Sequence, residues 1–281
     1  MDISGGSESD NIEDQRGSNG GRRVLVGGGI GTIAIVIIAL LLGQNPSTVL
    51  NNINGGNQAT SSSQPANSQQ DEEGRLFVSI ILKETEDVWT DIFQGMGRNY
   101  QKPKLALFND HVASGCGSAS SQVGPFYCPA DQKVYLDLSF FDELSQRFHA
   151  AGDFAKAYVI AHEVGHHVQN LLGISDKVHE LQQRTNEVGA NKLSVKLELQ
   201  ADFLAGVWAK HSTRLKINEQ DIAEALTAAA AIGDDALQRQ AQGYVVPDAF
   251  THGTSEQRMY WFKKGWQTGD INQGDTFGSD K

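Results

Sequence analysis

The sequence predicts an α+β fold, mainly helical with a small sheet, that follows one N-terminal transmembrane helix. Three observations support this prediction: a long uncharged apolar run near the N-terminus, two short β-like segments in the middle of the chain, and a series of helical patterns after residue 153. With 281 residues, the chain is long enough for one well-buried domain with appendages.

The charge balance and the cysteine count exclude two classes of protein. Acidic residues outnumber basic ones by 34 to 23, and no block of Lys or Arg occurs, so nucleic acid is excluded as a partner. The two cysteines, Cys116 and Cys128, are too few for a disulfide-rich scaffold, and they lack the paired spacing of a structural zinc site.

A membrane anchor is predicted over residues 24–43, which carry no charge, since about 20 apolar residues span a bilayer. A cleaved signal peptide is the alternative, but the run is longer than a typical signal core and no small-x-small cleavage site follows it directly. Arg16, Arg22 and Arg23 precede the run, and the next basic residue is Arg75. The positive-inside rule therefore predicts a single-pass membrane protein with a cytoplasmic N-terminus and an extracytoplasmic domain, periplasmic or on the cell surface.

Composition divides the rest of the chain. Residues 1–23 are expected to be a disordered cytoplasmic tail, because they contain few large apolar side chains. Residues 44–74 have the composition of a flexible linker, so the folded domain is expected to span residues 75–281. Outside the cytoplasm, Cys116 and Cys128 are expected to form a disulfide that adds about 3 kcal/mol on a chain-entropy estimate.

The folded part is predicted to begin with a helix over residues 75–96, from the helical spacing of its apolar positions. Short strands at 104–108 and 133–138 flank the loop between the cysteines, whose Gly and Ser content indicates turns. The second strand and this loop are expected to present an edge to an extended substrate. Periodicity and capping residues then predict helices over residues 153–172, 176–188, 191–211, 218–232 and 255–266.

The first helix of this series contains His162-Glu163-Val164-Gly165-His166. Histidines four residues apart lie on one helix face, so both rings can bind one metal ion. Glu163 lies beside them, where its carboxylate can take a proton from metal-bound water. A helix with two ordinary, satisfied histidines is the alternative, but the apolar residues before the motif are expected to bury the helix and exclude water around a metal.

A catalytic zinc ion has three protein ligands and one position for water. The residue six positions after His166 is Leu172, so a third ligand does not come from an extended histidine motif. Glu198 is the better candidate, because it shares a helix face with Asp202, which is expected to accept the second ring N–H of a ligand histidine. Two solvated acids are the alternative, which the apolar neighbours on that helix disfavour.

Two further residues are candidates for catalytic roles. His252 is expected to donate a hydrogen bond to the oxyanion of the reaction, and Arg258 either assists there or orders Glu198 or Asp202. Taken alone, each would more often be an ordinary loop or helix residue. His167 faces about 100° away from His166 and is expected to have a packing or hydrogen-bonding role.

These residues lie in four blocks through which the chain resembles the bacterial neutral zinc metallopeptidases, over residues 75–269. The blocks are CGSASSQVGPFYCPADQKVYLDLSFF at 116–141, AHEVGHHVQ at 161–169, LELQADFLAGVWA at 197–209 and HGTSEQRMYWFKKGW at 252–266. The resemblance implies an N-terminal transmembrane segment and an extracytoplasmic zinc-binding domain. The Glu198-x-x-x-Asp202 pair also resembles the third-ligand pattern of membrane-linked zinc peptidases that process prenylated or misfolded membrane proteins.

We therefore expect a zincin-like domain with one Zn²⁺ per chain that hydrolyses peptide or protein substrates. Three ligands are expected, His162, His166 and Glu198, with Glu163 as the base. The alternative from another class is a membrane-tethered binding or scaffold module with a structural zinc ion, which needs a fourth protein ligand, for which His252 is the candidate. A catalytically inactive regulator is a third interpretation, against which Glu163 argues.

Overall fold

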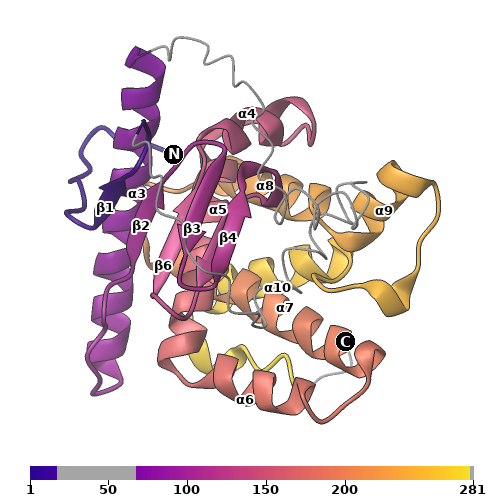
Figure 1. Cartoon of the computed structure of the whole chain (residues 1–281). Helices are drawn as coiled ribbons and strands as arrows, with labels where there is room; N and C mark the ends of the chain where they lie inside the picture. The colour runs from indigo at the N-terminus through magenta and orange to yellow at the C-terminus, as the bar shows by residue number, and fades with distance from the viewer. Residues whose placement is uncertain (18–67, 279–281) are drawn as a thin grey trace.

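The computed structural model describes residues 1–17 and 68–278, and it places helices on one side of a small sheet (Figure 1). The helices are α3 (Ser68–Gly95), α4 (Ser139–Gln146), α5 (Asp153–Leu171), α6 (Ile174–Gln182), α7 (Glu187–His211), α8 (Glu219–Ala231), α9 (Asp234–Gln242) and α10 (Ser255–Thr268). The strands are β1 (Ile12–Asp14), β2 (Lys104–Leu107), β3 (His111–Ser114), β4 (Gly117–Ser120), β5 (Phe126–Cys128) and β6 (Lys133–Leu136). The predicted α+β class, mainly helical with a small sheet, is confirmed.

The main sheet has the strand order β1-β2-β6-β5, in which β1, β2 and β6 are parallel and β5 is antiparallel to β6. Successive side chains along each strand point to opposite faces of the sheet. Leu105 and Leu107 belong to the large helical core, whereas Ala106 and Tyr135 pack with the β3–β4 hairpin on the other face. Within this sheet β6 is an interior strand, and the edges are β1 and β5, so the expectation that the strand at 133–138 offers an edge is wrong.

Three helices pack closely around the centre of the domain because glycines let their backbones approach. A Cβ atom at Gly165 of α5 would lie 3.0 Å from the carbonyl oxygen of Ala201 on α7. At Gly206 of α7, it would lie 2.1 Å from the carbonyl oxygen of Phe262 on α10. Larger residues would therefore force the helices apart. The glycine inside the HEVGH motif thus sets the separation between α5 and α7.

The N-terminal residues 1–17 are part of this domain, so the prediction that they form a disordered tail is wrong. Strand β1 adds in parallel to β2, with Glu13 opposite Ala106. The Glu13 carboxylate contacts both Lys104 and Lys133 at 2.6 Å. Ser9 is buried and donates a backbone hydrogen bond to Oγ of Ser79 on α3. Sheet hydrogen bonds and ion pairs stabilise the segment, and its few apolar side chains, Met1, Ile3 and Ile12, pack against the large core. So few apolar residues are the reason why its composition indicated disorder.

The second boundary also differs from the prediction. Helix α3 begins at Ser68, so residues 68–74 are helical and do not belong to the expected linker over 44–74. The predicted anchor at 24–43 and the remainder of the linker lie outside the described residues. Within residues 1–17 and 68–278, none of the helices combines the length and the apolar character needed to cross a membrane.

Each helix predicted downstream of residue 153 has a counterpart, and most ends lie within four residues of those expected. The helix predicted over 176–188 differs more, because it ends at Gln182. Thr254 makes a capping box with Gln257 at the start of α10, and Asn218 makes one with Asp221 at the start of α8. The short elements α4, α9, β3, β4 and β5 were not predicted. Of these, helix α9 has the closest connection to the candidate site, because it lies beside the segment that leads into α10 (Figure 1).

Candidate metal centre

Helix α5 carries the two histidines and the glutamate of the motif. His162 and Glu163 are buried, and His166 is partly buried. Apolar residues of the same helix, including Phe154, Tyr158 and Ala161, belong to the large core. The helix is therefore held by packing on most sides, while its motif residues lie at the boundary with α7.

Helix α7 brings Glu198 to the two rings. The Glu198 carboxylate oxygens lie 3.1 Å from Nε2 of His162 and 3.4 Å from Nε2 of His166. One ligand atom from each residue lies within 4.8 Å of the other two, and these three residues are called here the metal-ligand group. The spacing follows from the phase of the two helices and from their close approach at Gly165. Residues 36 positions apart thus converge at one point.

Each ring keeps Nε2 available because its Nδ1 atom is held elsewhere. His162 donates from Nδ1 to Oδ1 of Asp202 at 2.8 Å, as the sequence predicted. His166 donates from Nδ1 to Oε1 of Gln169 at 2.9 Å. The Gln169 amide in turn donates to the carbonyl oxygen of Leu197 on α7. Partners of this kind fix the tautomer and orientation of a ligand histidine. Gln169 was not predicted, although its position three residues after His166 on the helix was a usable signal.

Arg258 of α10 binds Asp202 rather than Glu198. Its Nε donates to Oδ2 of Asp202 at 2.8 Å, and its Nη2 donates to Oδ1 at 3.0 Å. Tyr158 also donates to Oδ1 at 2.6 Å, and all three side chains are buried. Burial alone would raise the pKa of Asp202, but the charges of Arg258 and His162 outweigh it and lower this pKa to about 2. Asp202 is therefore an anion that orients His162.

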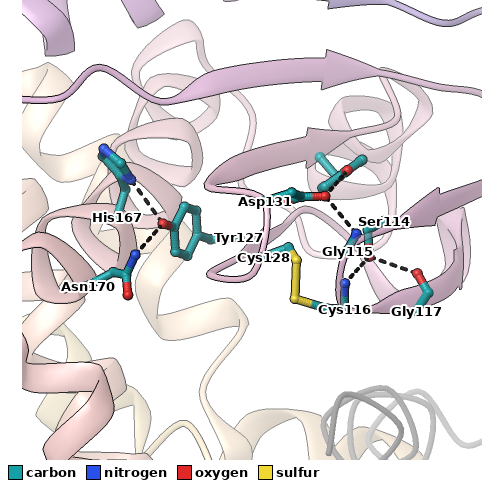
Figure 2. Close-up of a disulfide and its surroundings, with 10 residues drawn as sticks. Ser114, Gly115, Cys116, Gly117, Tyr127, Cys128, Asp131, His167 and Asn170 are labelled. Atoms are coloured by element: carbon teal, nitrogen blue, oxygen red, sulfur yellow. Dashed lines mark hydrogen bonds between the residues drawn. A yellow bond between two sulfur atoms is a disulfide. The ribbon is translucent and has the colours of Figure 1, made fainter. Parts of the chain in front are cut away.

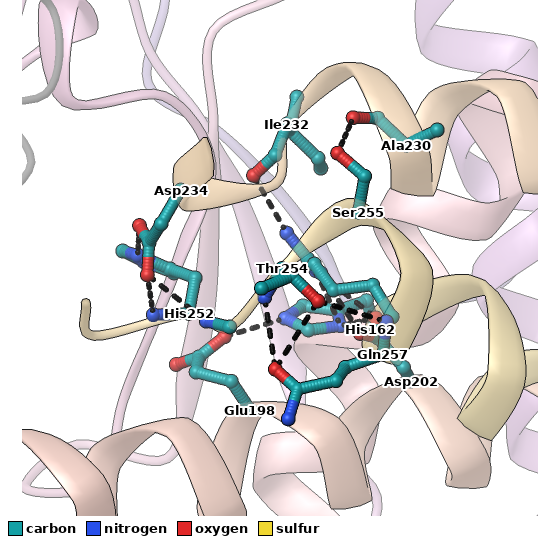
Figure 3. A network of polar contacts seen from close by, with 12 residues as sticks. His162, Glu198, Asp202, Ala230, Ile232, Asp234, His252, Thr254, Ser255 and Gln257 are labelled. Carbon is teal, nitrogen blue, oxygen red and sulfur yellow. Dashed lines mark hydrogen bonds and ion pairs between the residues drawn. The ribbon is translucent and has the colours of Figure 1, made fainter. Parts of the chain in front are cut away.

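His252 precedes α10 and lies on the side of Glu198 away from His162 (Figure 3). The Glu198 charge acts on it and contributes to a raised pKa, against the effect of burial. Its Nδ1 atom is 3.0 Å from Oγ1 of Thr251 and 3.3 Å from Oδ1 of Asp234. Within the described part of the chain, His252 is not a member of the metal-ligand group.

Glu163, the acidic residue of the motif, differs from the two histidines in having no fixed partner among the described residues. No hydrogen bond or ion pair joins its carboxylate to another of the described residues. Burial raises its pKa, and the charges of His162 and His166 oppose that rise. A carboxylate in this condition is poised to exchange a proton with a water beside the metal-ligand group.

The donor set of the metal-ligand group fits zinc. Two imidazole nitrogens and one carboxylate oxygen are a ligand set of catalytic zinc sites, which leave a fourth position for water. Tetrahedral bonds of about 2.0–2.1 Å would place ligand atoms about 3.4 Å apart. Each ring nitrogen contacts a different Glu198 oxygen, Oε2 at 3.1 Å for His162 and Oε1 at 3.4 Å for His166, and both distances are close to that spacing.

On the opposite side of α5, His167 connects the helix to the strand beside the disulfide (Figure 2). Its Nε2 donates to the carbonyl oxygen of Gln101 at 2.6 Å, and Tyr127 donates to its Nδ1 at 3.0 Å. Asn170 donates to the same tyrosine oxygen. Cys128 follows Tyr127 and forms the predicted disulfide with Cys116. His167 therefore has the hydrogen-bonding role expected of it and does not face the metal-ligand group.

The fold and the metal-ligand group together define a mainly helical α+β domain with a two-histidine, one-glutamate site. A family described as "Putative neutral zinc metallopeptidase" matches residues 1–277, and the chain belongs to this family. It is 48% identical over 284 residues to "Uncharacterized protein YpfJ" of Escherichia coli K12, covering 99% of both chains. It is 45% identical over 202 residues to "Uncharacterized protein Rv2575" of Mycobacterium tuberculosis H37Rv, covering 68% of this chain and 66% of that protein. No solved structure matches, so the zincin-like fold stays a prediction.

Proposed function

We propose that this protein is a zinc-dependent peptidase in which His162, His166 and Glu198 hold one Zn²⁺ per chain. The observation that carries the proposal is the metal-ligand group itself, with its atoms within 4.8 Å and Glu163 next to it in the chain. Membership of the zinc metallopeptidase family supports the same class of reaction.

The remaining side chains of the site transfer the protons and stabilise the negative charge that develops on the substrate. Zinc, when bound, supplies a Lewis acid that lowers the pKa of water and polarises a carbonyl group. Glu163 takes the proton from the attacking water and passes it to the leaving amine. His252 donates a hydrogen bond to the oxyanion that forms on the substrate carbonyl. Arg258 acts indirectly, because it holds the Asp202 carboxylate that orients His162.

A binding or scaffold module with a structural zinc ion is the alternative function. A closed structural site needs four protein ligands. The metal-ligand group contains three, and His252, the candidate for the fourth, lies outside it among the described residues. The unpaired Glu163 beside the group also has no purpose in a structural site. Both observations favour catalysis.

Strand β5 is the proposed binding edge for an extended substrate. It pairs with β6 on one side, and Tyr127 on β5 contacts His167 of the ligand-bearing helix. A peptide adding to the other side of β5 would run beside α5. Substitutions along β5 should then raise KM while zinc content stays unchanged, and an unchanged KM would remove this part of the proposal.

The domain is proposed to work outside the cytoplasm. Residues 24–43 are proposed to attach it to the membrane in a way that leaves residues 1–17 on the side of the domain, because β1 pairs with β2. The disulfide between Cys116 and Cys128 supports an oxidising compartment, since such bonds rarely persist in the cytosol. The anchor rests on the sequence alone.

The experiment uses the full-length chain, because a fragment starting at Arg75 would lack β1 and leave β2 as an open edge. Zinc content and casein cleavage are measured for the wild type and for Glu163→Gln. We expect about one zinc per chain in both, and cleavage lowered about 10²–10⁴-fold in the variant. Equal cleavage by both proteins would refute the role of Glu163. A zinc-loaded wild type that cleaves no substrate would favour the scaffold alternative.

A further inference from the structure

The Asp234 carboxylate, in the first turn of α9, holds the short loop that carries His252. Its Oδ2 atom accepts three consecutive backbone N–H groups, from Thr251 at 2.7 Å, His252 at 2.6 Å and Gly253 at 2.9 Å. Residues 251–253 are called here the histidine loop. The Asp234 backbone N–H donates to the carbonyl oxygen of Gly253 at 2.9 Å, so the two segments bind each other in both directions.

The second carboxylate oxygen faces the histidine ring. Oδ1 of Asp234 is 3.3 Å from Nδ1 of His252, and Oγ1 of Thr251 is 3.0 Å from the same nitrogen (Figure 3). A carboxylate can only accept a hydrogen bond, so this contact requires the proton on Nδ1. Because Nδ1 is bound on the side of α9, Nε2 is the ring nitrogen that can interact on the side of Glu198. One carboxylate thus fixes both the backbone and the ring.

The burial of Asp234 makes this arrangement rigid. Its side chain is completely inaccessible to solvent, whereas the His252 side chain is 22% exposed. A buried carboxylate is strongly destabilising unless donors surround it, and hydrogen bonds to an ionised acceptor are about twice as strong as neutral ones. The donors here come from the histidine loop, so a displacement of the loop would leave a buried charge unsatisfied. The loop is therefore held in place, with His252 beside Glu198 of the metal-ligand group (Figure 3).

We propose that Asp234 is a positioning residue for His252, which fixes the histidine loop and the ring so that Nε2 is directed to the substrate carbonyl. The proposal rests on the proposed function only for the role of His252, since the contact between Asp234 and the ring is independent of catalysis. It adds a residue from α9, a helix that the motif pattern of the sequence did not indicate.

Asp234→Asn is the sharpest variant, because it keeps the size of the side chain and removes one acceptor. The three backbone N–H groups require the remaining oxygen, so the new NH₂ group faces Nδ1 of His252. The ring must then lose its Nδ1 proton or turn away. Asp235→Asn is the matched control, since Asp235 accepts hydrogen bonds from Ser255 and makes none to the histidine loop.

The first readout is independent of activity. In full-length protein labelled with ¹⁵N-histidine, with the His252 signals assigned by their loss in His252→Ala, Asp234→Asn should move Nδ1 from the protonated to the unprotonated position. Asp235→Asn should leave it unchanged. An unmoved Nδ1 signal in Asp234→Asn would overturn the proposal, whatever the protein catalyses.

The second readout separates positioning from general stabilisation. Asp234→Asn should lower kcat for casein about tenfold, with KM and zinc content unchanged, since the oxyanion donor that it positions is worth about 10²–10³-fold. In a His252→Ala background the same change should have no further effect on kcat. An equal loss in both backgrounds would overturn the proposal. A shifted Nδ1 signal without any effect of His252→Ala on kcat would instead refute the proposed role of His252.

Discussion

The two sides of α5 hold their histidines in opposite ways. On the side of α7, burial acts to lower the pKa of His162, but Asp202 and Glu198 outweigh it and raise this pKa to about 10. On the side of the sheet, burial lowers the pKa of His167 to about 4, and the hydrogen bond to the Gln101 carbonyl opposes this only in part. His166 and His167 are adjacent in the chain, yet their partners give them different chemistry.

The difference shows that the partner type, rather than burial, decides what a histidine can do here. Carboxylates on one side favour a positive charge at the rings, whether a proton or a metal ion carries it. Neutral partners on the other side use both nitrogens of His167, with Nε2 as donor and Nδ1 as acceptor. His167 therefore has no free ligand atom, although it directly follows the motif.

Removal of the Glu198 carboxylate, which contacts both His162 and His166, should have the largest effect. Glu198→Ala leaves two histidines without the third ligand, and we expect zinc to be lost and casein cleavage with it. Glu187→Ala, an exposed residue of the same helix, is the control and should keep both. Zinc content after dialysis and initial rates are the measurements. Retention of one zinc per chain in Glu198→Ala would show that the ligand assignment is wrong.

The second prediction concerns the buried ion pair behind His162. Arg258→Met leaves Asp202 as an uncompensated buried charge, so the free energy of unfolding should fall by about 3–5 kcal/mol. Arg239→Met removes an exposed pair with Asp235 and should cost less than about 1 kcal/mol. Urea unfolding of zinc-free protein measures both. Similar losses in the two variants would mean that Arg258 does not stabilise the α7 side of α5.

The third prediction concerns the pH dependence of the free energy of unfolding that comes from His167, on the sheet side of α5. The pKa of His167 is lower in the folded protein than in the unfolded chain, so only the unfolded chain takes up its proton as the pH falls from about 6.5 to about 4. His167 should therefore contribute a loss of about 3 kcal/mol of stability over this interval and none above it.

His167→Gln tests this contribution, because the difference between wild type and variant isolates one group from the others that titrate. The difference in unfolding free energy should be largest near neutral pH and should shrink by about 3 kcal/mol towards pH 4. Zinc-free protein is used for both, so that metal release does not enter. A difference that is constant with pH would mean that His167 is not held neutral.

The smallest effect is expected at the partner of His166. Gln169→Leu removes the acceptor for its Nδ1 and should weaken zinc binding by about 10- to 100-fold without abolishing it. Gln220→Leu, at an exposed position, should leave the affinity unchanged. Competition with a chromogenic chelator gives both values. An unchanged affinity in Gln169→Leu would show that the orientation of His166 is set by packing alone.

The residues that the sequence predicted best are those fixed by helix periodicity. His162 and His166 share a face because they are four residues apart, and Glu198 and Asp202 share one for the same reason. Asp234 was missed because its contact with His252 joins residues 18 positions apart through a loop, which no periodicity describes. Strand β1 was missed because three residues, of which only Ile12 is apolar, are too few to show an alternating pattern, and its partner β2 lies far along the chain.

The pairing of β1 with β2 has a consequence for the compartment of the N-terminus. A single crossing of a bilayer about 30 Å thick between residues 17 and 68 would separate the two strands, and none of their hydrogen bonds could form. Paired strands must share one side of the membrane, which conflicts with an N-terminus in the cytoplasm and a domain outside it. Arg16, counted towards a cytoplasmic N-terminus, is bound instead to Asp14.

This shared side can be measured directly, because both native cysteines are bonded to each other and an introduced thiol is then free to react. Ser7→Cys and Ser145→Cys place exposed thiols on the N-terminal segment and on α4. In right-side-out membrane vesicles, an impermeant maleimide should label both to the same extent. Labelling of Ser145→Cys alone would mean that the chain crosses the membrane between the two segments and that β1 does not pair with β2 there. Equal labelling means that the first strand of the chain folds in the same compartment as the domain that it completes.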